Sequence, residues 1–111
     1  MDISENSRDG AVVMTAAGRL DSSTASVLEA VLPARAKEEK SLVLDLAAVP
    51  YVSSAGLRVL LIGAKAAKAA GHRLIITGLS TAVREVFDIS GFSKIFSIET
   101  DVDSAIAVLA G

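Results

Sequence analysis

Two apolar runs on either side of one long helical pattern place the strongest constraint on the fold of this 111-residue chain. Residues 42–46 and 74–77 have the nearly continuous apolar character of strands that are buried on both faces. Between them, apolar residues recur at helical spacing over residues 55–70, and Gly71 is a typical residue just after a helix end. Adjacent parallel strands need such a crossover helix. The pattern therefore predicts an α/β fold with a largely parallel sheet.

The residues before this unit predict a hairpin and a first helix. Residues 2–7 and a strand around Val12-Val13-Met14 flank the turn signal Arg8-Asp9-Gly10. Asp21-Ser22-Ser23-Thr24 then supplies several N-cap candidates for a helix that runs toward Pro33. Because proline cannot donate a backbone hydrogen bond, this helix is expected to end early or to kink there.

The residues after the unit predict two further helices and one short strand. Ser80-Thr81 begins a helix that continues to Ile89, residues 94–98 form a strand, and residues 101–110 form a terminal helix. The order β-β-α-β-α-β-α-β-α predicts one mixed sheet of about five strands, an N-terminal hairpin plus mainly parallel strands, with about four helices. Because 111 residues suffice for one modest core, we expect a single domain over residues 1–111.

Composition and charge argue against several functional classes. The chain has no cysteine and one histidine, so we expect no thiolate metal site and no imidazole cluster. No motif for a cofactor is visible either, and we expect none to be bound. A net charge of −2 supplies no electrostatic attraction for nucleic acid or an anionic membrane. Neither a signal peptide nor an apolar run of about 18 residues is visible, which predicts a cytoplasmic protein without membrane insertion.

The junction after the first apolar run carries the most informative polar residues. The run from Tyr51 to Leu61 places Ser53 and Ser54 where a strand meets a helix N-terminus. Backbone N–H groups there have no intrahelical partner, and the helix dipole favours negative charge. A phosphate on such a serine meets donors, whereas no general base stands beside it in the sequence. The junction therefore suits a reversible phosphoryl switch; the plain alternative is that Ser54 is a helix N-cap.

Three motifs follow one another in a specific order and spacing along the chain. They are Gly18-Arg19-Leu20-Asp21 with Thr24, Leu42–Leu46 followed by Tyr51–Leu57, and Val83–Phe92. Together they resemble the STAS domain of bacterial anti-sigma factor antagonists (anti-anti-sigma factors) over nearly the whole chain. The resemblance implies a single STAS-like domain.

In that family, a serine at this junction is phosphorylated by the partner anti-sigma factor, which is a kinase that uses ATP. The resemblance places this serine at Ser54, with Ser53 as the alternative acceptor. It implies an anti-sigma factor antagonist and not an enzyme. The unphosphorylated form binds an anti-sigma factor with serine kinase activity and releases the target of that factor. Phosphorylation at Ser54 switches the protein off, and a serine phosphatase resets it.

One common form of the family has an aspartate before the acceptor and a serine or threonine after it. This chain has Ser53 and Ala55 at those positions. Ser53 supplies no carboxylate that would orient or deprotonate Ser54, and it is itself a hydroxyl that a kinase can use.

The same resemblance predicts the partner surface. The expected contacts lie in the loop before the first helix, at the junction, and on an outward stripe of the second helix. These residues are Asp21, Ser22, Ser23, Ser53, Ser54, Ala55, Arg58, Ile62 and Lys65. Without the resemblance, Asp21 is a turn or helix-start residue, and the two cations belong to a solvated face. An alternative function with the same surface is a constitutive STAS scaffold or a regulatory subunit of a transporter ATPase or sensory complex.

Overall fold

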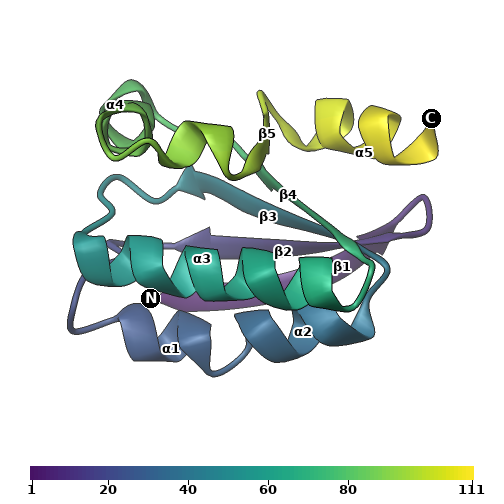
Figure 1. Cartoon of the computed structure of the whole chain (residues 1–111), viewed down its shortest axis with the longest axis horizontal. Helices are drawn as coiled ribbons and strands as arrows, with labels where there is room; N and C mark the ends of the chain where they lie inside the picture. The colour runs from purple at the N-terminus through teal and green to yellow at the C-terminus, as the bar shows by residue number, and fades with distance from the viewer.

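The five predicted strands form one mixed sheet with the spatial order β1-β2-β3-β4-β5 in the computed structural model (Figure 1). The hairpin strands β1 and β2 are antiparallel, and each later neighbour pairs in parallel. The strands are β1 (Asp2–Arg8), β2 (Ala11–Ala17), β3 (Ser41–Ala48), β4 (Arg73–Thr77) and β5 (Ser97–Glu99). The predicted fold class is therefore confirmed, including the antiparallel N-terminal hairpin.

Helices pack on both faces of this sheet. They are α1 (Ala25–Glu29), α2 (Leu32–Glu38), α3 (Ser54–Ala69), α4 (Thr81–Ile89), α5 (Val102–Ala110) and the 3-10 turn η1 (Phe92–Lys94). The larger apolar cluster, of 22 buried residues, joins the sheet to α1, α2, α3 and α4, and a smaller one of 6 lies under α5. Figure 1 shows α5 on the opposite side of the sheet from α1, α2 and α3. None of the helices has the combined length and hydropathy that a membrane span requires.

The first predicted helix is divided in two. α1 ends at Glu29, and Pro33 lies in the first turn of α2. Proline fits there because the first N–H groups of a helix have no intrahelical partner anyway. The expectation that the helix ends before Pro33 is confirmed. The same proline also lies in the first turn of a second helical segment, which the sequence pattern does not reveal.

The last strand is shorter than the predicted range 94–98. η1 covers Phe92–Lys94, and only Ser97–Glu99 pair with β4. The ring centroid of Phe96 lies 5.4 Å from that of Phe87 and 6.0 Å from that of Phe92. In an extended strand, residues four apart are separated by about 13 Å. The turn η1 brings the rings of Phe92 and Phe96 together on the larger apolar cluster, which an extended strand could not do.

The carboxyl ends of the parallel strands lie together at one edge of the sheet, and the loops that follow β2, β3 and β4 start there. Residues 18–24 leave β2, residues 49–53 leave β3, and residues 78–80 leave β4. α3 starts at this edge, on the left of Figure 1, and runs back along the sheet. The predicted acceptor serines at the start of α3 and the loop that contains Asp21 therefore lie at the same end of the molecule.

Candidate functional site

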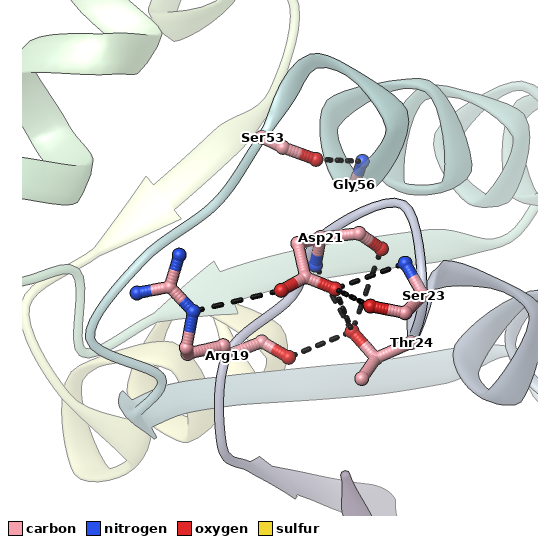
Figure 2. Close-up of polar contacts among 6 residues, drawn as sticks. All are labelled: Arg19, Asp21, Ser23, Thr24, Ser53 and Gly56. Carbon is pink, nitrogen blue, oxygen red and sulfur yellow. Dashed lines mark hydrogen bonds and ion pairs between the residues drawn. The ribbon is translucent and has the colours of Figure 1, made fainter.

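The loops that follow β2 and β3 run side by side. The Leu20 N–H donates to the carbonyl oxygen of Tyr51 at 2.9 Å, and the Ser53 N–H donates back to the Leu20 oxygen at 2.9 Å. Leu20 and Val52 form an isolated parallel bridge. These bonds extend the pairing of β2 with β3 beyond the strand ends, and they bring Asp21 beside the start of α3 (Figure 2).

Gly56 allows the first turn of α3 to approach this loop pair closely. The glycine is buried, and a Cβ at its position would lie 2.7 Å from Leu20 Cγ and 2.9 Å from the Leu20 carbonyl oxygen. Leu20 has little room to move, because it is fully buried and its oxygen accepts the bond from Ser53. The absence of a side chain at residue 56 therefore sets the spacing between α3 and the Leu20 loop.

Replacing Gly56 by Ala is expected to destabilise the protein by about 1–3 kcal/mol, the usual cost of extra atoms in a packed contact. At an open helical position the same change would instead stabilise the protein by about 0.5–1 kcal/mol. Urea denaturation measures the sign, and the backbone amide shifts of Leu20 and Asp21 report whether the loop moves. A gain in stability would show that the loop yields without cost.

Asp21 organises the turn before α1. Its Oδ1 accepts hydrogen bonds from the Ser23 N–H at 3.0 Å and the Ser23 hydroxyl at 2.9 Å, and its Oδ2 lies 3.5 Å from Arg19 Nε (Figure 2). Thr24 Oγ1 accepts from the Asp21 N–H at 2.9 Å and donates to the Arg19 carbonyl oxygen at 2.7 Å. The hydrogen bonds from Ser23 lower the pKa of Asp21 below its ordinary value. Asp21 is therefore a negatively charged group with a fixed orientation at neutral pH.

Arg19 and Tyr51 join the two loops through a contact that no local sequence signal predicts. The guanidinium carbon of Arg19 lies 4.3 Å from the centre of the Tyr51 ring, which is a cation–π distance. Tyr51 is 41% exposed, and the Arg19 side chain is 61% exposed. The two residues occur in separate motifs and meet only because the loops pair. They add a cation and an aromatic ring to the predicted surface.

The N-cap of α3 is Ser53, so the alternative that Ser54 is the cap is wrong. Ser53 Oγ accepts a hydrogen bond from the Gly56 N–H at 3.3 Å (Figure 2). Ser54 is the first helical residue and is exposed, and its hydroxyl has no hydrogen-bond partner within the chain. Ser53 Oγ thus accepts one hydrogen bond from the helix backbone, whereas Ser54 Oγ makes no hydrogen bond within the chain.

The exposed face of α3 continues from Ser54. Arg58 and Lys65 are exposed, and their positions, four and eleven residues after Ser54, fall on nearly the same side of a helix. Ser22 and Ser23 are exposed in the neighbouring loop. The structure therefore places these predicted residues on accessible surface near the junction or along one helix face.

Ile62, predicted on the outward stripe, and Ala55, predicted at the junction, are both less exposed than expected. Ile62 is half-buried rather than solvent-exposed. Val59 and Ala66, three residues before it and four after it, are both buried, and such positions are neighbours on a helix surface. Ala55 is half-buried against the larger apolar cluster. Both residues therefore lie on the flank of α3 instead of its outward face.

Comparisons with known proteins identify the family of the sequence. A family model described as the STAS domain matches residues 2–105. The chain is 40% identical over 108 residues to BtrV of Bordetella bronchiseptica, which is named as a proposed anti-sigma factor antagonist. This match covers 96% of the chain and 93% of BtrV.

Solved structures share the fold. An anti-sigma factor antagonist from Mycobacterium paratuberculosis has a TM-score of 0.89 at 24% identity, and the match covers 99% of this chain and 94% of that protein. The Bacillus cell fate determinant SpoIIAA, in its phosphorylated form, has a TM-score of 0.71 at 18% identity, with 96% and 99% of the two chains covered. At these identities the likeness concerns the arrangement of helices and strands.

Proposed function

Because the chain belongs to the STAS-domain family of anti-sigma factor antagonists, we propose that it is a phosphorylation-controlled binding protein rather than an enzyme. The unphosphorylated form binds an anti-sigma factor that is also a serine kinase, and this binding releases the target of that factor. Phosphorylation of Ser54 ends the binding, and a serine phosphatase restores it. The cycle takes place in the cytoplasm.

The observation that carries this proposal is the exposed hydroxyl of Ser54 beside the half-buried capping hydroxyl of Ser53. Ser53 Oγ caps α3, whereas Ser54 is exposed on the first turn and has no internal partner. In the transfer, Ser54 Oγ forms a bond to the γ-phosphorus of ATP, ADP leaves, and a base of the kinase takes the hydroxyl proton. The protein thus contributes a positioned acceptor, and the kinase contributes the chemistry.

A phosphate on Ser54 is compatible with this fold. It adds a charge of about −1.5 to −2 at neutral pH. The first N–H groups of α3 and the positive end of its dipole favour an anion at this place. Arg58 lies one helical turn further along the same exposed face. The phosphate is therefore expected to act on the partner interface and to leave the stability of the domain unchanged.

The proposed partner surface surrounds this hydroxyl. Asp21 and the exposed serines of its loop lie on one side, and the face of α3 with Arg58 and Lys65 lies on the other. We include Arg19 and Tyr51, since both are exposed and the loop pairing holds them in place. Ile62 and Ala55 stay in the proposed surface as flanking contacts. A new charge at the centre of such a surface would be desolvated on binding, which is costly.

Ser54→Asp is expected to lower affinity for the anti-sigma partner about tenfold or more, since a loss of about 1.4 kcal/mol suffices. Aspartate carries less charge and fewer oxygens than phosphoserine, so it imitates the switched-off state incompletely. The melting temperature of the Ser54→Asp protein should be no lower than that of the parent protein, because the helix N-terminus favours an anion. Isothermal titration calorimetry and thermal unfolding measure the two quantities separately.

Ser54→Asn is the matched control, because it has nearly the shape of aspartate without the charge. It should retain most of the affinity. Undiminished affinity in Ser54→Asp, together with undiminished affinity of the truly phosphorylated protein, would contradict a charge switch. That outcome would instead favour a constitutive scaffold or a regulatory subunit of a transporter ATPase or sensory complex.

A further inference from the structure

Ser54, the proposed phosphate acceptor, has a cation at the spacing that makes residues adjacent on a helix. Arg58 lies four residues after Ser54 in α3, and both residues are exposed. The Cβ atoms of residues four apart are separated by about 5–6 Å on a helix surface. Long side chains on a helix also lean toward its N-terminus, so an arginine at position 58 reaches over the turn that contains Ser54.

The other helical neighbours of Arg58 are apolar. The positions three and four residues before and after it carry Ser54, Ala55, Leu61 and Ile62. Moreover, α3 contains no aspartate or glutamate from Ser54 to Ala69. Arg58 takes part in no ion pair, but several other cations do not either. What distinguishes Arg58 is that its one polar neighbour on the helix is the residue proposed to gain a negative charge.

The loop on the other side of the junction does not favour a phosphate. Asp21 lies there, beside the start of α3 (Figure 2). The hydrogen bonds from Ser23 lower the pKa of Asp21, so its carboxylate is ionised at neutral pH, and they fix its orientation. A phosphate on Ser54 that turned toward this loop would approach a like charge.

The cation of that loop, Arg19, is already engaged. Its Nε lies 3.5 Å from Asp21 Oδ2, and its guanidinium carbon lies 4.3 Å from the centre of the Tyr51 ring. To reach the phosphate, Arg19 would have to give up both contacts. Arg58 has no such contact to lose, and it lies on the side of α3 that a phosphate repelled by Asp21 would face.

We propose that Arg58 holds the phosphate of phosphorylated Ser54 in an ion pair along the outward face of α3. The inference takes the identity of the acceptor from the proposed function. Guanidinium N–H groups match phosphate oxygens in geometry and form charge-assisted hydrogen bonds with them. The anion precedes the cation along the helix, which is the favourable order for such a pair. Because Arg58 belongs to the proposed partner surface, the ion pair also withdraws a cation from that surface.

The phosphate itself reports the ion pair. Full-length protein with phosphoserine incorporated at residue 54 during translation is titrated through the second ionisation of the phosphate, at about pH 6, and followed by ³¹P NMR. Because a nearby cation favours the dianion, Arg58→Gln should raise the midpoint of this titration by about 0.3 pH units or more. Arg58→Lys should raise it less, since lysine keeps the charge. An unchanged midpoint in Arg58→Gln would overturn the proposal.

Lys65→Gln is the matched control for net charge. It removes one positive charge from the same face of α3, about 16 Å further along the helix axis. This distance exceeds the screening length of about 8 Å at physiological ionic strength, so the midpoint should move by less than about 0.1 pH units. Arg58 and Lys65 are exposed, so both variants should melt like the parent protein. Equal rises in the two variants would indicate a general charge effect and would contradict a specific pair.

The arginine Nε–H signals in ¹H–¹⁵N spectra distinguish Arg58 from Arg19. Phosphorylation at Ser54 should shift the Arg58 signal and slow the exchange of its proton with water. The Arg19 signal should respond less, because Arg19 stays between Asp21 and Tyr51. A larger response at Arg19 would overturn the proposal and would assign the phosphate to the Asp21 loop.

The outcome for the ion pair is independent of the outcome for the proposed function. Phosphoserine incorporated during translation requires no kinase, and the ³¹P titration requires no partner. If the cognate kinase modifies another residue, or if phosphate on Ser54 leaves partner affinity unchanged, the proposed function fails. The ³¹P titration would still decide whether Arg58 holds the phosphate.

Partner titration tests the withdrawal of Arg58 from the interface. In the unphosphorylated protein, Arg58→Gln should weaken partner binding about threefold or more, whereas in the phosphorylated protein it should change the remaining affinity less than about twofold. This difference is expected because Arg58 is already paired with the phosphate in the second case. No loss in the unphosphorylated form, or equal losses in both forms, would contradict the withdrawal of Arg58.

Discussion

Replacing Ser54 by Ala is expected to abolish phosphorylation and to leave partner binding intact. The change removes the exposed hydroxyl of the junction. Because that hydroxyl has no partner within the chain, the free energy of unfolding should change by less than about 0.5 kcal/mol. Incubation with ATP and the cognate kinase, followed by intact-mass spectrometry, measures the phosphate. Urea denaturation measures the stability.

Ser53→Ala is the matched control, and it should show the opposite pattern. Loss of the cap to the Gly56 N–H should cost about 1 kcal/mol of stability. Phosphate should still be incorporated, and peptide mapping should find it on Ser54. Full phosphorylation of the Ser54→Ala protein, with the phosphate on Ser53, would contradict the assignment of the acceptor.

Leu60→Ala is expected to destabilise the domain by about 2–5 kcal/mol, the usual cost of a large cavity in a core. Leu60 is 0% exposed and belongs to the larger apolar cluster. Ile62→Asp, two residues further on, should cost clearly less, because Ile62 is only half-buried and outside that cluster. It should weaken partner binding, since the new charge lies beside the proposed surface.

Urea denaturation of both variants, with circular dichroism and partner titration, tests this contrast. If Ile62→Asp unfolds the protein as readily as Leu60→Ala, the flank of α3 at Ile62 belongs to the core rather than to the partner surface. If Ile62→Asp changes neither stability nor affinity, Ile62 makes no contribution to the interface.

Sequence periodicity was sufficient for the mixed sheet and for the order of its strands and helices, apart from the division of the first helix and the 3-10 turn. The buried strands β3 and β4 are apolar on both faces, and Gly71 adopts the left-handed conformation, φ +73°, expected after a helix end. The strand-to-helix junction with Ser53 and Ser54 could also be placed, because it depends on the same pattern. Such features follow from neighbours in the sequence, so local chemistry suffices to predict them.

Pro33 and the aromatic residues near the C-terminus show where this approach fails. A proline is compatible with the end of one helix and with the first turn of the next, and here both occur: α1 ends at Glu29, and Pro33 lies in the first turn of α2, which packs on α3. Likewise, Phe92–Lys94 has no local signal for a 3-10 turn. The turn forms because Phe92 and Phe96 both reach the apolar cluster in that way.

The detailed properties of the site depend on segments that are distant in the sequence. Whether Ser53 or Ser54 has the free hydroxyl depends on where α3 begins, and the pairing of Leu20 with Tyr51 and Ser53 holds that start in place. The contact between Arg19 and Tyr51 depends on the same pairing. A single sequence reveals which residue types are present at a junction. The side chain that faces solvent there depends on how the neighbouring loop packs against it.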